Sequence, residues 1–180
     1  MTITTTGLTR AAALAAAAAG AIFVAVQVNH PSMDAESVQT TEWAVRNSAK
    51  ALMTVLALAG ITGIYLRQRR EVGVLGLAGY LLFAVGYLAM FSVEMIATTV
   101  LPTLARTDPG YVNDVLAAAA GGVAQGDIGA LQTVLTLSGV GYMAGGLLLG
   151  TALFRARVLA RWASLLLAVG TVGTAALAVL

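Results

Sequence analysis

Long apolar runs alternate with short polar stretches along the whole chain. A helix needs about 20 mostly apolar residues to cross a bilayer, so runs of this length predict membrane-spanning helices. The predicted spans are residues 8–28, 41–66, 72–104, 128–154 and 158–180. We therefore expect an all-α fold, a polytopic transmembrane bundle of five spanning helices that forms a single domain over residues 1–180.

The polar stretches carry signals that end one helix and begin the next. Pro31 ends the first helix, because proline lacks the backbone N–H that the helix ladder needs. Thr40 or Thr41 is a good N-cap for the second helix, with Glu42 in its first turn. Asp127 is the expected cap of the fourth helix.

The third run is too long for one straight crossing. Its 33 residues, 72–104, would measure about 50 Å as a helix, whereas the hydrocarbon core is about 30 Å thick. The arginines at 67, 69 and 70 are expected to separate it from the second helix, and Pro102 predicts a bend near its far end.

A short amphipathic helix is predicted at residues 109–120, outside the spans. Asp108 followed by Pro109 is a typical helix start, and apolar residues then recur at helical spacing from Tyr111. Gly121 ends the helix. The segment is too short to cross a membrane, so we expect it to lie at the outer interface.

Basic residues indicate the orientation of the bundle. Seven of them fall on one predicted side: Arg10, Arg67, Arg69, Arg70, Arg155, Arg157 and Arg161. Three fall on the other side: Arg46, Lys50 and Arg106. Because cytoplasmic loops are enriched in Lys and Arg, this predicts a multi-pass cell-membrane protein with a cytoplasmic N-terminus and an external C-terminus.

The composition excludes several classes of protein. Apolar residues make up 59% of the chain and charged residues 10%, whereas globular proteins have about 25% charged residues. This excludes water-soluble enzymes and nucleic-acid binders. The chain has no cysteine, which excludes disulfides and thiolate catalysis, and one histidine, which excludes a His-rich metal site. We expect the lipid bilayer as a partner and no cofactor.

Small residues predict how the helices pack. In lipid, close approach of helix backbones at glycine replaces the hydrophobic effect as a source of association. The glycines at helical spacing are Gly79, Gly86, Gly141, Gly145, Gly146 and Gly150. These faces could seat neighbouring helices of the same chain, which we favour, or a second copy in a homo-oligomer.

Glu94 is the most informative polar residue, because an ionisable side chain inside a span costs free energy unless it is paired, protonated or functional. We expect an outward-facing pocket on its helix face and on polar faces of the second and fourth helices. The candidate ligand-binding residues are Glu94, Tyr87, Tyr80, Phe91, Thr98, Lys50, Asn47, Gln132 and Thr136. The alternative is that Glu94 is a rim carboxylate paired with a cation, that the aromatic residues fill the core and that Thr98 bonds its own backbone.

His30 could form a hard metal site with Asp34 or another carboxylate. No metal-ligand spacing of the HExxH type is present, and a histidine before proline is more typical of a turn. We therefore rank the metal site below the turn.

Several short motifs recur at the helix ends and within the helices: residues 20–23 leading to Asn29-His30-Pro31, the run 76–83 before Glu94, and residues 154–156 leading to 161–163. With these motifs the chain resembles small uncharacterised membrane proteins common in high-GC bacteria, similar to the polytopic family known as domain of unknown function 4386. The resemblance covers most of the chain and implies a membrane fold, but no activity.

Three functions are compatible with this sequence. The first is binding or transport of a small amphiphile or lipid through an outward-facing pocket near Glu94, with the helix from Pro109 as part of a lid. The second is a structural or regulatory membrane subunit assembled through glycine faces. The third, ranked last, is an intramembrane enzyme with Glu94 as acid or base.

Overall fold

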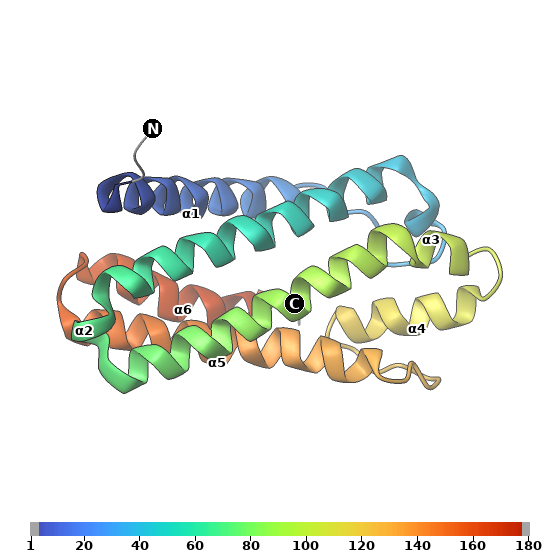
Figure 1. The fold of residues 1–180 in the computed structure, drawn as a ribbon. Helices are drawn as coiled ribbons and strands as arrows, with labels where there is room; N and C mark the ends of the chain where they lie inside the picture. Colours follow the sequence, from blue (N-terminus) through green and yellow to red (C-terminus); the bar gives the residue numbers. More distant parts are fainter. Residues whose placement is uncertain (1–3, 178–180) are drawn as a thin grey trace.

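A computed structural model describes residues 4–177 (Figure 1). The chain is 82% helical, and the described part contains no strand. Its elements are α1 (Thr5–Gln27), η1 (Ser37–Gln39), α2 (Thr41–Thr99), α3 (Leu101–Leu104), α4 (Pro109–Ala119), α5 (Leu131–Ala156) and α6 (Arg161–Leu177). The last three residues of the expected span 158–180 lie outside the described part.

The second and third predicted helices form one element, α2, that folds back on itself at Gly73 (Figure 1). Gly73 has φ 58° and ψ −155°, a backbone conformation that is essentially restricted to glycine. The sequence suggested that the arginines at 67, 69 and 70 separate the second helix from the third, but the helix continues past them to Gly73. Arginine is a good helix former, so the reversal waits for a residue that can adopt positive φ. We call residues 41–72 and 74–99 the first and second arms of α2.

The second arm ends at Thr99, close to the bend expected near Pro102. Val100 leaves ideal helical geometry, with φ −107° and ψ −51°, and α3 follows as a single short turn with Pro102 near its start. Proline clashes with the carbonyl four residues before it, which accounts for a break at this point.

The amphipathic helix α4 does not lie flat at the end of the bundle. It runs alongside α2 and α5 (Figure 1), with Val112, Val115 and Leu116 buried. These side chains join an apolar cluster that we call the end cap, which consists of Ala35, Val38, Trp43, Ala97, Leu101, Ala105, Val112, Val115, Leu116 and Ile128. The apolar stripe of α4 is therefore covered by protein. Its expected position at the outer interface stays a prediction.

Asp127 does not cap α5. Its Oδ1 accepts a hydrogen bond of 2.7 Å from the backbone N–H of Gly129, and the helix begins at Leu131 after Ala130. Gly129 has φ 60°, so the chain makes a further turn before the helix can start. The cap prediction therefore placed the helix start about one turn too early.

The predicted glycine faces pack helices of the same chain together. A Cβ at Gly141 would lie 2.8 Å from the Cα of Gly86, and one at Gly145 would overlap the backbone of Phe83. On the opposite side of α5, a Cβ at Gly150 would lie 2.7 Å from the backbone N of Ala168 in α6. Gly79 and Gly146 make similar contacts with Leu149 and Thr171. α5 is therefore held between the second arm of α2 and α6.

Among residues 4–177, three helices are long and apolar enough to cross a membrane: α1, α2 and α5. Large apolar side chains on their outer surfaces are exposed, among them Leu14, Val55 and Leu81. These features indicate association with a membrane.

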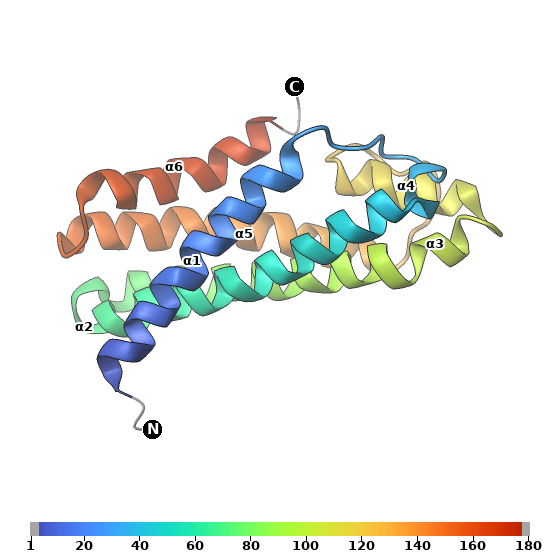
Figure 2. The ribbon, with the colours of Figure 1, turned by 90° about the horizontal axis from the view of Figure 1, so that it is seen from above.

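The bundle has two unlike ends and an open side. The reversal at Gly73 and the turn between α5 and α6 share one end, whereas α3, α4 and the loop after α1 share the other (Figure 1). α1 packs against α2 and α6 against α5, and within the described residues α1 and α6 do not pack against each other (Figure 2).

Candidate ligand-binding site

A cavity of about 510 Å³ lies beside the end cap, between α2, α4 and α5. We call it the polar cavity. Five of the predicted ligand-binding residues line it: Asn47, Lys50, Glu94, Gln132 and Thr136. They come from both arms of α2 and from α5, so the fold brings together residues that are up to 89 positions apart in sequence.

Trp43 and Asn47 fix one wall of the polar cavity. The indole Nε1 of Trp43 donates a buried hydrogen bond of 3.0 Å to the carbonyl of Ala97, which joins the two arms of α2. Asn47 Nδ2 donates to the carbonyl of Trp43 at 2.8 Å. The amide orientation of Asn47 is thereby set, and its Oδ1 is left as an acceptor.

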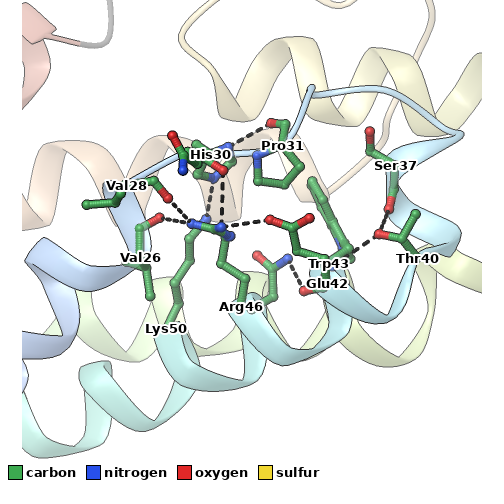
Figure 3. Close-up of polar contacts among 12 residues, drawn as sticks. Val26, Val28, His30, Pro31, Ser37, Thr40, Glu42, Trp43, Arg46 and Lys50 are labelled. Atoms are coloured by element: carbon green, nitrogen blue, oxygen red, sulfur yellow. Dashed lines mark hydrogen bonds and ion pairs between the residues drawn. The ribbon is translucent and has the colours of Figure 1, made fainter.

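Lys50 reaches the loop that follows α1 (Figure 3). Its Nζ lies 3.0 Å from Nε2 of His30, whose Nδ1 lies 2.9 Å from the carbonyl of Pro31. Since a carbonyl can only accept, Nδ1 carries the proton and donates to Pro31, and Nε2 accepts from the Lys50 ammonium. Burial, together with the positive charges of Lys50 and Arg46, lowers the pKa of His30 below its usual 6.5.

Arg46 fastens the end of α1 to α2. Its Nη1 donates to the carbonyls of Val26 at 2.7 Å and Val28 at 2.9 Å, and its Nη2 donates to the carbonyl of Asn29 at 3.1 Å (Figure 3). Nη2 also pairs with Glu42 Oε1 at 2.8 Å. A cation at a helix C-terminus satisfies carbonyls that the helix itself leaves unbonded.

Glu94 faces the polar cavity from the second arm. Within residues 4–177, the ion pair at contact distance is Glu42–Arg46, and Glu94 makes none. The hydroxyl of Thr98 donates a hydrogen bond of 2.8 Å to the backbone carbonyl of Glu94, as the alternative to a ligand-binding role had predicted. Thr98 does not line the polar cavity. Thr136 likewise bonds the carbonyl of Gln132 at 2.8 Å while lining the cavity.

A second, larger cavity of about 730 Å³ is lined mainly by apolar residues of α1, α2, α5 and α6. We call it the apolar groove. Tyr87 lines it, and its ring packs against Phe83 at 4.9 Å and Tyr142 at 5.7 Å between ring centroids. Met90, Ala119 and Gly139 line both the groove and the polar cavity, so the two spaces adjoin.

Three of the predicted ligand-binding residues line neither space: Thr98, described above, Tyr80 and Phe91. Tyr80 stacks on Tyr65 with 4.5 Å between ring centroids, and its hydroxyl lies 3.2 Å from Thr62 Oγ1. It therefore joins the two arms of α2 near their reversal. Phe91 lines neither the polar cavity nor the apolar groove.

The two candidate metal ligands make local hydrogen bonds. Both ring nitrogens of His30 have partners, as described above. Asp34 Oδ1 accepts from the backbone N–H of Ser37 at 2.7 Å, which lowers the pKa of that carboxyl. Among the described residues, no group of three or more His, Cys, Asp or Glu side chains is placed to hold a metal ion.

Sequence reasoning missed the role of Arg46. Arg46 was treated as a charge for orientation, yet it lies four residues before Lys50 and therefore on the same face. That spacing could have suggested a basic cluster facing the end of α1. Gly139 shares a helical stripe with Gln132 and Thr136, which suggests that it lines the same cavity, but its place where two cavities meet depends on the fold.

Comparisons with known proteins identify no relative: no family model, no curated protein and no solved structure matches this chain. The resemblance to uncharacterised membrane proteins thus stays a prediction, and functional conclusions rest on the geometry.

Proposed function

We propose that the chain crosses the membrane five times, through α1, the two arms of α2, α5 and α6. The arginine-rich end, with the reversal at Gly73 and the α5–α6 turn, is cytoplasmic, in accordance with the positive-inside rule. The end cap and the polar cavity then face outward. At 1.5 Å per residue, the 21 residues from Gly73 to Glu94 rise about 30 Å, which puts Glu94 at the outer boundary of the hydrocarbon core.

We propose that the protein binds, and in doing so helps to transport or present, a small amphiphilic or lipid-like molecule. One observation carries this proposal: Asn47, Lys50, Glu94, Gln132 and Thr136 converge on a cavity that adjoins an apolar groove. Polar groups fix the orientation of a ligand in such sites, and apolar walls accept the remainder of the molecule.

A binding panel tests this function. The purified protein in mild detergent is exposed to three C12 amphiphiles with different heads: dodecylamine, dodecanoate and dodecanol. We expect at least one to raise the melting temperature, and Glu94→Gln to reduce that rise without changing the melting temperature of the free protein. Glu71→Gln is the matched control, because Glu71 is exposed at the opposite end. The proposal fails if no amphiphile stabilises the protein, or if Glu94→Gln responds like the wild type to all three.

Two other functions have less support. Assembly of a homo-oligomer through glycine faces competes with the intrachain contacts that already occupy Gly86, Gly141 and Gly150. Acid–base catalysis needs a second group within hydrogen-bond reach of the substrate. The one histidine of the chain, His30, has both ring nitrogens engaged by Pro31 and Lys50.

A further inference from the structure

We propose that the ligand is a single-chain amphiphile with a protonated amine head, bound with its ammonium at Glu94 and its hydrocarbon chain in the apolar groove. This inference rests on the proposed function and assigns to it a ligand class and a binding orientation.

Two residues of the polar cavity offer acceptors to a ligand head. Asn47 uses its Nδ2 on the carbonyl of Trp43 and offers Oδ1. Glu94 offers a carboxylate that has no cation at contact distance within residues 4–177. An alkylammonium head has three N–H donors and a positive charge, so it matches both groups.

Lys50, the cation of this cavity, donates one N–H to Nε2 of His30 at 3.0 Å, and the bond from Nδ1 to Pro31 fixes the tautomer that accepts it. The ammonium keeps its charge and two further N–H groups. Glu94 makes no ion pair within residues 4–177, so a carboxylate head beside it would meet an unpaired carboxylate, whereas an ammonium head can pair with it. Glu94, rather than the net charge of the cavity, is therefore the group that favours a cationic head over an anionic one.

The apolar groove supplies the place for the chain. It adjoins the polar cavity at Met90, Ala119 and Gly139, so a molecule with its head at Glu94 can continue into it. Two of its walls come from α1 and α6, which do not pack against each other in the described residues, so no direct contact between these helices closes the groove. A chain can thus enter sideways from the lipid without its head crossing the bundle. The groove volume, about 730 Å³, falls within the usual range for sites of single small ligands.

Head selectivity is the first test, and it uses the same three C12 amphiphiles. We expect dodecylamine to bind at least tenfold more tightly than dodecanoate or dodecanol, and Glu94→Gln to remove most of that preference. The protein with Glu94→Asp should keep it, because the charge is retained. If dodecanoate or dodecanol binds as well as dodecylamine, the amine assignment is overturned while the proposed function stands. If none binds, both fail.

Orientation is the second test, and the two tryptophans make it direct. Trp43 lines the polar cavity, whereas Trp162 is 72% exposed at the far end of the bundle, so Trp162→Phe leaves Trp43 as the single fluorophore. Bromine quenches tryptophan at contact range. We expect strong quenching by an alkylamine brominated next to its head and little by one brominated at its terminal carbon. Equal quenching by the two, or stronger quenching by the terminal bromine, overturns the proposed orientation.

The junction between the two spaces provides the third test. A Cβ at Gly139 meets no atom within 4 Å, so a side chain can begin there without a backbone clash, and we expect the leucine of Gly139→Leu to extend into the junction. We expect it to weaken dodecylamine binding at least tenfold and leave butylamine, which is little more than the head, nearly unaffected. Gly173→Leu is the control, because Gly173 is equally uncrowded in α6 but lines neither space. Unchanged dodecylamine binding in Gly139→Leu contradicts the placement of the chain.

Discussion

Arg46 connects two segments that the sequence presents as independent. Its guanidinium donates to three carbonyls at the end of α1 while its backbone belongs to α2. A planar group with five donors suits this task, because neighbouring carbonyls at a helix end diverge and a single ammonium cannot meet them all. The side chain is only 13% exposed, so water competes weakly for these bonds.

Replacing Arg46 should therefore destabilise the α1–α2 contact. We expect Arg46→Ala to lower the free energy of unfolding by about 3 kcal/mol, because several charge-assisted hydrogen bonds are lost together. Arg46→Lys should recover less than half of the loss. The measurement is reversible unfolding in mixed micelles. Glu42→Gln is the control and should cost little, since the Glu42 side chain is 59% exposed. Equal effects of Arg46→Ala and Glu42→Gln would refute the assigned role.

His30 should make stability depend on pH. Its pKa in the folded protein lies below 6.5, through burial first and then through the charges of Lys50 and Arg46, against the opposing effects of its hydrogen bond to Pro31 and of Glu42. The unfolded chain therefore takes up the proton more readily than the folded protein. The contribution of neutral His30 to the free energy of unfolding is complete above pH 6.5 and is lost as the pH falls through the folded pKa. We expect the melting temperature to fall between pH 7.5 and 5, and His30→Gln to flatten this profile. A wild-type protein that becomes more stable over the same range would contradict the neutral, accepting role of His30.

At the scale of the helices, two glycines of α5 differ in whether a neighbouring backbone lies against them. Gly145 lies against the backbone of Phe83, so the α2–α5 contact requires the missing side chain. Gly139, on the same helix, has free space around its Cα. The sequence pattern cannot distinguish these two glycines, because the difference depends on which helix covers each one.

This difference gives a matched pair of substitutions on α5. Gly145→Ala should lower the free energy of unfolding by about 2 kcal/mol, because the methyl group overlaps the backbone of Phe83 and pushes the helices apart. Gly139→Ala should raise it by up to about 1 kcal/mol, because alanine is the better helix former. Unfolding titrations of both proteins provide the comparison. Similar changes of the same sign would contradict the described α2–α5 packing.

Helical periodicity and apolar length were sufficient to predict the elements but not their connections. The break before Pro102 follows from a chemical property of that residue and could be foreseen. The reversal at Gly73 could not, because arginines at 67, 69 and 70 form helix as readily as they end it. The path of α4 also escaped prediction, since its apolar stripe fits a membrane interface or the end cap equally well.

At the scale of the whole molecule, charge is divided between the two ends of the bundle. The arginine-rich turns lie at one end, and Asp34, Asp108 and Asp127 belong to the segments at the other (Figure 1). This division supports the proposed orientation. The polar cavity and the basic turns therefore lie toward opposite ends of the bundle, with the apolar outer surfaces of the long helices between them.

Because the chain has no cysteine, single cysteines can report its orientation. Ser32→Cys lies in the exposed loop after α1, and Val158→Cys lies in the α5–α6 turn, where Val158 is 50% exposed. We expect a membrane-impermeant maleimide to label Ser32→Cys in intact cells and Val158→Cys after permeabilisation. Labelling of Val158→Cys in intact cells would reverse the proposed orientation and put the polar cavity on the cytoplasmic side.

Five of nine ligand-binding residues suggested by the sequence line one cavity, and the reason is geometric. Glu94, Lys50 and Asn47 stand near the same end of two antiparallel arms, so an estimate of depth along each helix placed them at a common level. Tyr80 shares the helix face of Glu94 but lies several turns away, and helical periodicity alone does not register that distance along the axis.

The order in which the long helices pack has a consequence for biosynthesis. Each contact between them joins neighbours along the chain: α1 with α2, α2 with α5, and α5 with α6. A ribosome delivers these segments in the same order, so every newly inserted helix finds its partner already in the bilayer. No segment has to remain unsupported while a distant one is translated, and a nascent chain arrested after α5 would already hold its central helices together.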